Sequence, residues 1–371
     1  MENKPRDPYS YLFPLGILSA TLAVLLWVGF DLKWIHFFPK QAHANLMFFS
    51  FFWSFIAGFL MTAIPKMTQT FAAQKAELAI TVGFVILQWL VNLNNQIYFS
   101  VLLFFIQLLV LLTFVIRRFL KKKQLPFEGF IFLPAAFVSA IIGLICFFIK
   151  GEEAYSLLYL FSGQAFVLNL ICGLGSRLIP VLTRIPMSLS PDQKGSVSKM
   201  KEMIILMLTL NTTFLIEAFY TEKLGYALRF IVFSIILIRY FKIFHKPSIR
   251  SFVGIGLRLS LYIMAFSYLA LAVMNGAVLP ILHFVFIGGF TLVTLMVATR
   301  VTIAHGGESL DLELKSKTLI LTSVTLLISA FSRFQNGSQF SGFWMNLAVL
   351  FFLIGLYTWF IRFFKIMGKF S

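Results

Sequence analysis

The sequence is poor in charged residues and in cysteine. Only 12% of its 371 residues are charged, whereas a soluble domain has about 25%. Its 14 acidic residues are fewer than half of its 31 lysines and arginines. The two cysteines, Cys146 and Cys172, both lie inside apolar runs. These shortages exclude a soluble enzyme, a secreted disulfide scaffold and a Cys/His zinc site.

Long apolar runs take the place of the missing charge. The chain is 59% hydrophobic with a mean hydropathy of +0.90, and a membrane-spanning helix needs about 20 apolar residues. We therefore expect an all-α membrane protein, one polytopic domain over residues 1–371 with about twelve transmembrane helices. No small-residue cleavage site follows the first run, which predicts a retained helix. The expected spans are 11–30, 42–64, 76–93, 97–116, 127–149, 155–182, 200–220, 224–241, 252–274, 278–302, 318–331 and 343–364.

The basic residues alternate between the two sides of these spans. If the N-terminus is inside, 23 of the 31 lysines and arginines fall in inner segments and five in outer ones. Cytoplasmic loops of membrane proteins carry such an excess. The distribution predicts that both termini are cytoplasmic in a multi-pass protein of the cell inner (plasma) membrane. It also explains the net charge of +17 as a topology signal, so we expect no nucleic-acid partner.

Two histidines lie where polar side chains are costly. His43 begins the second expected span and His283 lies one turn into the tenth. Both spans run from outside to inside, so the imidazoles lie at a similar shallow depth. Two such imidazoles can form the axial pair of a haem iron, and Gly288 and Gly289 would leave a smooth helix face for a flat macrocycle. Alternatively, each histidine only hydrogen-bonds a neighbouring helix or an interfacial water.

A second polar cluster lies at the inner ends of the sixth and tenth spans. Arg177 and Arg184 are seven residues apart on one helix face, and Arg300 and His305 approach the same membrane surface. Such a cluster can bind an anion or a propionate, or anchor helix ends at the interface. Apart from Glu217, no glutamate or aspartate lies mid-span, which argues against a carboxylate proton relay.

Three sequence blocks together resemble the NnrS family of polytopic bacterial membrane proteins. They are His43-Ala-Asn-Leu-Met47 with Ala57-Gly-Phe-Leu-Met-Thr-Ala-Ile-Pro65; Ser176-Arg-Leu-Ile-Pro-Val-Leu-Thr-Arg184; and His283 with Gly288-Gly289, Arg300-Val301 and Ala304-His-Gly-Gly307. The resemblance implies binding of haem and copper and a role in nitric-oxide stress or denitrification. The chain departs from the family in its first block, where Asn45 and Leu46 replace a histidine and a glutamate. His43 and Met47 are retained.

The chain is also similar, more distantly, to subunit I of the haem–copper oxidases. That resemblance implies an oxidase-like bundle, a low-spin haem held by one histidine on the second span and one on the tenth, here His43 and His283, and Arg333 beside the propionates. The sixth and seventh spans contain no histidine. We therefore expect no oxygen-reducing copper site, and any redox activity would pass through haem.

These observations leave three hypotheses. The first is a haem b protein of NnrS type, with His43 and His283 as ligands, that senses or scavenges nitric oxide or exchanges electrons with a redox partner. The second is a cofactor-free transporter of an anionic solute that uses the inner arginines. The third is a family member that has lost its cofactor and serves as a scaffold or assembly subunit.

Overall fold

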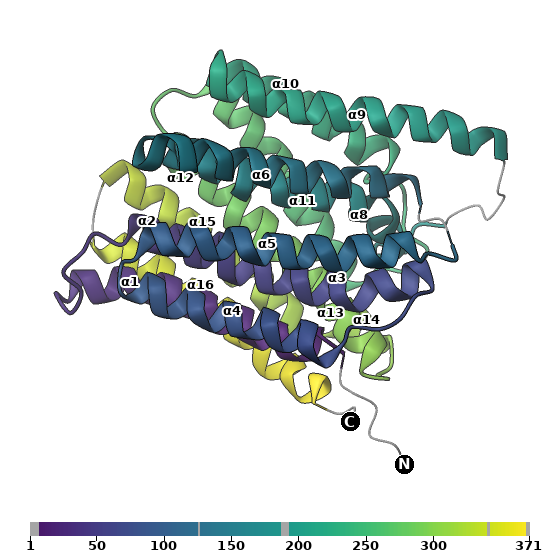
Figure 1. Ribbon diagram of the computed structural model, residues 1–371, viewed down its shortest axis with the longest axis horizontal. Coiled ribbons are helices and arrows are strands. Elements are labelled where there is room, and N and C mark those ends of the chain that lie inside the picture. Colours follow the sequence, from purple (N-terminus) through teal and green to yellow (C-terminus); the bar gives the residue numbers. More distant parts are fainter. Residues whose placement is uncertain (1–6, 125–126, 187–192, 340–341, 369–371) are drawn as a thin grey trace.

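The computed structural model describes residues 7–124, 127–186, 193–339 and 342–368. Helices lie side by side along the long axis of the molecule, and no strand occurs among these residues (Figure 1). The elements in chain order are α1 Tyr9–Asp31, α2 Lys40–Asn45, η1 Leu46–Phe52, α3 Trp53–Thr68, α4 Lys75–Leu93, α5 Ile97–Leu120, η2 Glu128–Ile131, α6 Phe132–Lys150, η3 Gly151–Ala154, α7 Tyr155–Leu158, η4 Tyr159–Ala165, α8 Phe166–Leu182, α9 Gln193–Phe219, α10 Glu222–Arg239, α11 Phe252–Val273, α12 Val278–His283, η5 Phe284–Thr291, α13 Leu292–His305, α14 Asp311–Lys315, α15 Lys317–Gln339 and α16 Gly342–Met367.

The described chain carries ten helical stretches that are long and apolar enough to cross a membrane. This confirms an all-helical protein of the multi-pass membrane class. One stretch, Glu128–Leu182, has 55 residues and turns at η3, where Gly151 has a positive φ of 61°. α10 is not among the ten because it carries four charged residues. The number of about twelve spans therefore stays a prediction.

The eleventh helix is longer than its apolar run. The sequence predicts a span over 318–331, but α15 continues to Gln339. The polar residues after Phe331 end the hydropathy signal, although they do not end the helix, because the end of a span lies in the polar interface. Arg333 consequently lies within a helix and not in an outer loop.

The bundle is most tightly packed around three composite helices, α2–η1–α3, α7–η4–α8 and α12–η5–α13. The first is 83% buried and the third 72% buried within the protein over their most apolar windows. Each contains a π-helical segment, in which one extra residue widens the turn. Such segments are rare and often occur at functional sites.

The two ends of the bundle are distinguished by their contacts. The ring of Tyr9, at the start of α1, contacts that of His305, at the end of α13, and α16 ends nearby, since Ile366 packs against Gly306. At the opposite end, Asn346 of α16 donates to Asp31 at the end of α1. The first residue of α1 and the last of α16 therefore lie at one end, which we call the terminal end (Figure 1).

A candidate cofactor cavity lined by two histidines

A cavity of about 710 Å³ lies at the end of the bundle opposite the terminal end. Its walls come from α1, α2, η1, α7, η4, α9, α10, α12, η5, α15 and α16. Sites for small molecules and cofactors are typically clefts of about 300–1,000 Å³ with apolar walls and a few polar groups. This cavity, hereafter the histidine cavity, has that size and character. Aromatic and aliphatic side chains dominate it, among them Trp27, Phe48, Phe52, Leu282, Phe286 and Phe352.

His43 and His283 both line the histidine cavity. The sequence predicts the two histidines at a similar depth, because their spans run in the same direction. The structure places both in one cavity. His43 Nδ1 lies 2.9 Å from the backbone oxygen of Ala23 on α1, and His283 Nδ1 lies 2.8 Å from the backbone oxygen of Leu279. A carbonyl oxygen only accepts, so each Nδ1 carries the proton and donates it.

This tautomer leaves Nε2 of each imidazole with a free lone pair. Metal-ligating histidines characteristically donate their other ring nitrogen to a carbonyl or carboxylate, which fixes the ring and raises its basicity. Both rings are also restrained by neighbouring aromatics, because His43 packs edge-on against Trp27 and His283 against Phe286. The two histidines thus have the hydrogen bonding and restraint that are characteristic of metal-ligating histidines.

Each histidine lies just before a π-helical segment in the chain. His283 is the last residue of α12 before η5, and His43 is followed by Ala44, Asn45 and then η1. Met47 lies within η1 and lines the cavity, with 8% of its surface exposed. The sequence does not reveal these segments, because an apolar π-turn and an apolar α-turn have the same composition.

Arg333 extends the set of predicted residues that the cavity collects. It lines the wall from α15, and its charge acts on both His43 and His283. A guanidinium has the donor geometry that carboxylates bind best. The wall therefore has a cation within electrostatic reach of both imidazoles.

The prediction that Gly288 and Gly289 present a smooth face to the cofactor site is wrong, because both glycines face α11. A Cβ on Gly288 would lie 3.0 Å from Ile263, and one on Gly289 would overlap Met264. Both neighbours belong to α11, and neither glycine lines the cavity. These glycines allow η5 to approach α11 closely. The flat surfaces that line the cavity are aromatic rings and not a glycine face.

The cavity lining also includes an acidic group to which the sequence analysis gave no role. Glu217, near the end of α9, lines the cavity with Glu222 and Tyr226. Its carboxylate forms an ion pair of 2.6 Å with Arg229 of α10, and the two side chains are 8% and 0% exposed. The sequence signal for this pair was the presence of two oppositely charged residues twelve positions apart, one on each helix of a hairpin.

Asn45, where the resemblance implies a histidine, does not line the cavity. It is fully buried. Its Oδ1 accepts from the Tyr159 hydroxyl at 2.9 Å, and its Nδ2 donates to Ser100 Oγ at 3.0 Å. Ser100 in turn donates to Gln88 at 2.7 Å. Asn45 therefore connects the cavity-lining Tyr159 to a buried polar network.

The four residues of the predicted inner cluster, Arg177, Arg184, Arg300 and His305, do not form one site. They make separate contacts at the terminal end. Arg184 and Arg300 both bind Glu313 of α14, at 2.8 and 2.7 Å, and Glu313 is fully buried. Sequence reasoning missed this carboxylate because nothing distinguishes it from the other acids of its loop.

The other two members of that cluster have different neighbours. His305 lies 2.5 Å from the Asp7 carboxylate, and this hydrogen bond, with nearby Lys66, holds the pKa of Asp7 below its usual value. Arg177 lies over the ring of Phe127 at 5.5 Å. Arginines that already face a carboxylate are less available to an anionic solute than free ones.

Among the described residues, no group of three or more histidine, cysteine, aspartate or glutamate side chains is arranged to hold a metal ion. A search among curated proteins finds no match. The model of the NnrS protein family matches residues 6–369, nearly the whole chain. The chain therefore belongs to the NnrS family.

Proposed function

We propose that this protein binds one b-type haem in the histidine cavity, with His43 and His283 as axial ligands, and acts in the nitric-oxide response or in electron transfer. The observation that carries the proposal is the pair of imidazoles in one cavity, each with Nδ1 donating to a backbone carbonyl and Nε2 left free. That arrangement suits a metal centre. Membership of the NnrS family is consistent with a nitric-oxide role.

The residues present fit a haem by three criteria. The volume of about 710 Å³ lies in the range of cofactor sites. The walls offer aromatic faces from Phe48 and Phe286 for an apolar macrocycle, and Arg333 offers a cation for its carboxylates. When bound, haem would supply a one-electron redox centre that can also take a diatomic gas once an axial histidine leaves.

The roles of the protein's own residues follow from their bonds. His43 is anchored to a different helix, α1, through Ala23, whereas His283 is anchored to its own helix through Leu279. We therefore expect His43 to be the more firmly fixed ligand and His283 the one that leaves for a gas. Two filled axial positions favour sensing or electron transfer over turnover.

The membrane topology belongs to the same proposal. We expect twelve crossings, both termini in the cytoplasm of an inner-membrane protein, and the histidine cavity near the outer face. The excess of lysine and arginine in the inner segments supports this orientation. Fusion of a fluorescent reporter at the C-terminus should give a folded, fluorescent cytoplasmic domain; activity of a C-terminal periplasmic phosphatase fusion would contradict it.

Optical spectroscopy tests the haem proposal directly. We expect the purified protein, made with ample haem, to give a six-coordinate low-spin spectrum in reduced-minus-oxidised difference. His43→Ala and His283→Ala should each abolish the low-spin bands, while His36→Ala, in an exposed loop, should leave them unchanged. A colourless wild type, or bands that survive both substitutions, would refute the proposal.

Arg333 provides a second, quantitative test. A positive charge near the iron would stabilise the reduced state, which carries one positive charge less than the oxidised state. Arg333→Gln removes such a charge and should therefore lower the midpoint potential of the haem. The matched control is Arg362→Gln, an exposed arginine of α16. An unchanged potential in Arg333→Gln would show that this residue does not face the cofactor.

A further inference from the structure

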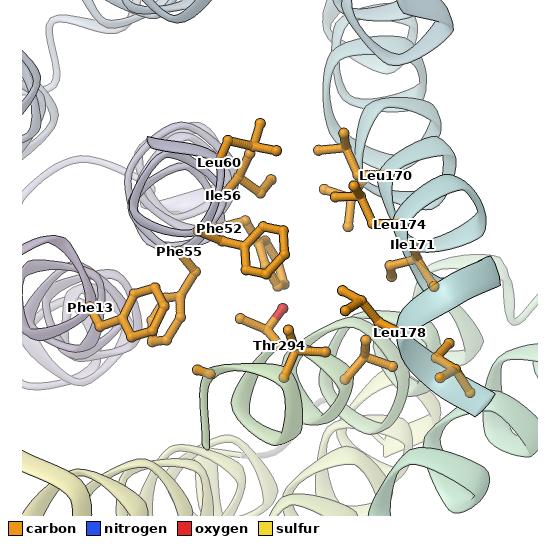
Figure 2. A pocket seen from close by; sticks show the side chains of 17 residues that line it. Phe13, Phe52, Phe55, Ile56, Leu60, Leu170, Ile171, Leu174, Leu178 and Thr294 are labelled. Atoms are coloured by element: carbon orange, nitrogen blue, oxygen red, sulfur yellow. The ribbon is translucent and has the colours of Figure 1, made fainter. Parts of the chain in front are cut away.

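A second, smaller cavity lies between α3, α8 and α13, on the terminal side of the π-helical segments. Its volume is about 100 Å³. Figure 2 shows Leu60, Leu170 and Thr294 from these three helices directed toward one space, and α1 adds Phe13. We call this space the gas cavity.

The gas cavity is almost entirely apolar. Thr294 is the only residue with a polar side chain among those that line it. A buried water needs two to four polar partners, and cavities that lack them stay dry and take apolar guests such as xenon or benzene. A volume of about 100 Å³ is several times the roughly 10–15 Å³ that one water-sized probe occupies. The space suits one or more small uncharged molecules better than water.

One aromatic ring belongs to both cavities. Phe52, the last residue of η1, lines the histidine cavity and the gas cavity, and it is 1% exposed. Its ring contacts Phe48 and Phe290, with centroids 5.8 and 6.1 Å away. A rotation of this side chain would therefore open one space toward the other.

We infer that the gas cavity binds small uncharged diatomic gases and passes them around Phe52 to the histidine cavity. The binding step rests on the shape and chemistry of the gas cavity alone. The passage step rests on the proposed function, because it needs a haem at its end. A site for such gases within the bundle draws on the membrane, where apolar gases are more soluble than in water.

Xenon tests the binding step without any cofactor. Crystals of the full-length protein pressurised with xenon should show an anomalous peak among Phe55, Leu174 and Val297. Val297→Phe, which fills the space, should lose the peak. Val138→Phe, the same change at a 55% exposed position of α6, should keep it. No peak in the wild type, a lipid or detergent tail in its place, or a peak that persists in Val297→Phe would overturn the inference; the wild-type result decides even if a variant does not fold.

Gas-binding kinetics test the passage step. In a His283→Ala background with reduced haem, Val297→Phe should slow carbon monoxide binding several-fold in stopped flow, whereas Val138→Phe should not. Equal rates beside a clear xenon peak would overturn the passage but leave the binding site. A colourless protein would refute the proposed function and remove the passage, while xenon would still decide whether the gas cavity exists.

Discussion

The ion pair between Glu217 and Arg229 should be the most sensitive polar contact in the bundle. The two side chains are 8% and 0% exposed and their charged atoms are 2.6 Å apart. Arg229 also donates from Nε to Thr213 at 3.2 Å and lies 3.5 Å over the ring of Phe214. Glu217→Gln would leave the guanidinium buried without a counter-charge, and removing one partner of a buried pair costs about 3–5 kcal/mol.

The two single substitutions should not be equally costly. An unpaired carboxylate can take up a proton and become neutral, whereas a guanidinium cannot lose one. Arg229→Met should therefore destabilise the protein less than Glu217→Gln. The double variant should lose less than the sum of the two single losses, because it leaves no uncompensated buried charge.

The assay is equilibrium unfolding in detergent micelles, followed by tryptophan fluorescence for all four members of the cycle. Glu152→Gln in the exposed η3 turn is the control and should stay within about 0.5 kcal/mol of the wild type. If Glu217→Gln matches this control, or if the double variant loses the sum of the two single losses, the pair does not stabilise the fold as argued.

Three further substitutions test other contacts. Asn45→Ala should cost about 1–3 kcal/mol of unfolding free energy, because it removes the buried hydrogen bonds to Tyr159 and Ser100 and leaves the Tyr159 hydroxyl only its longer contact of 3.3 Å with the Gln41 backbone oxygen; a chemical denaturation curve equal to the wild type would contradict this. Glu313→Gln should cost roughly 1–3 kcal/mol in the same assay, less than for a fully buried cluster because the two arginines that it binds are 22% and 28% exposed, and normal stability would show that the cluster is dispensable. Gly143→Ala should lower the melting temperature, because its Cβ would lie 2.9 Å from the backbone nitrogen of Ser162 and push η4 from α6; an unchanged melting temperature would mean that the helices can separate without loss.

The apolar runs predicted the helices well because burial in lipid demands a nearly continuous apolar surface. Ten of the resulting stretches meet the length and hydropathy expected of a span. Hydropathy failed at the end of α15, where Arg333 continues the helix into a polar region. It also gave no sign of η1, η4 or η5, since a π-turn differs from an α-turn in hydrogen bonding and not in residue type.

The candidate site was predicted in part because helix parity is a strong geometric constraint. Knowing that two spans run in the same direction places His43 and His283 at one depth, and the cavity contains both. Parity says nothing about which helices are neighbours in space, however. The pairing of Glu313 with Arg184 and Arg300, and the approach of α11 to Gly289, depend on lateral packing that no periodicity encodes.

The most serious objection to a cofactor in this chain is that Asn45 replaces a histidine of the family. The structure weakens that objection, because residue 45 does not face the cavity that His43 lines. Its side chain lies between Tyr159 and Ser100, fully buried. Leu46 is also fully buried and absent from the cavity lining. Both departures therefore change the packing and hydrogen bonding behind Tyr159, and they leave the two imidazoles, Met47 and Arg333 around the cavity intact.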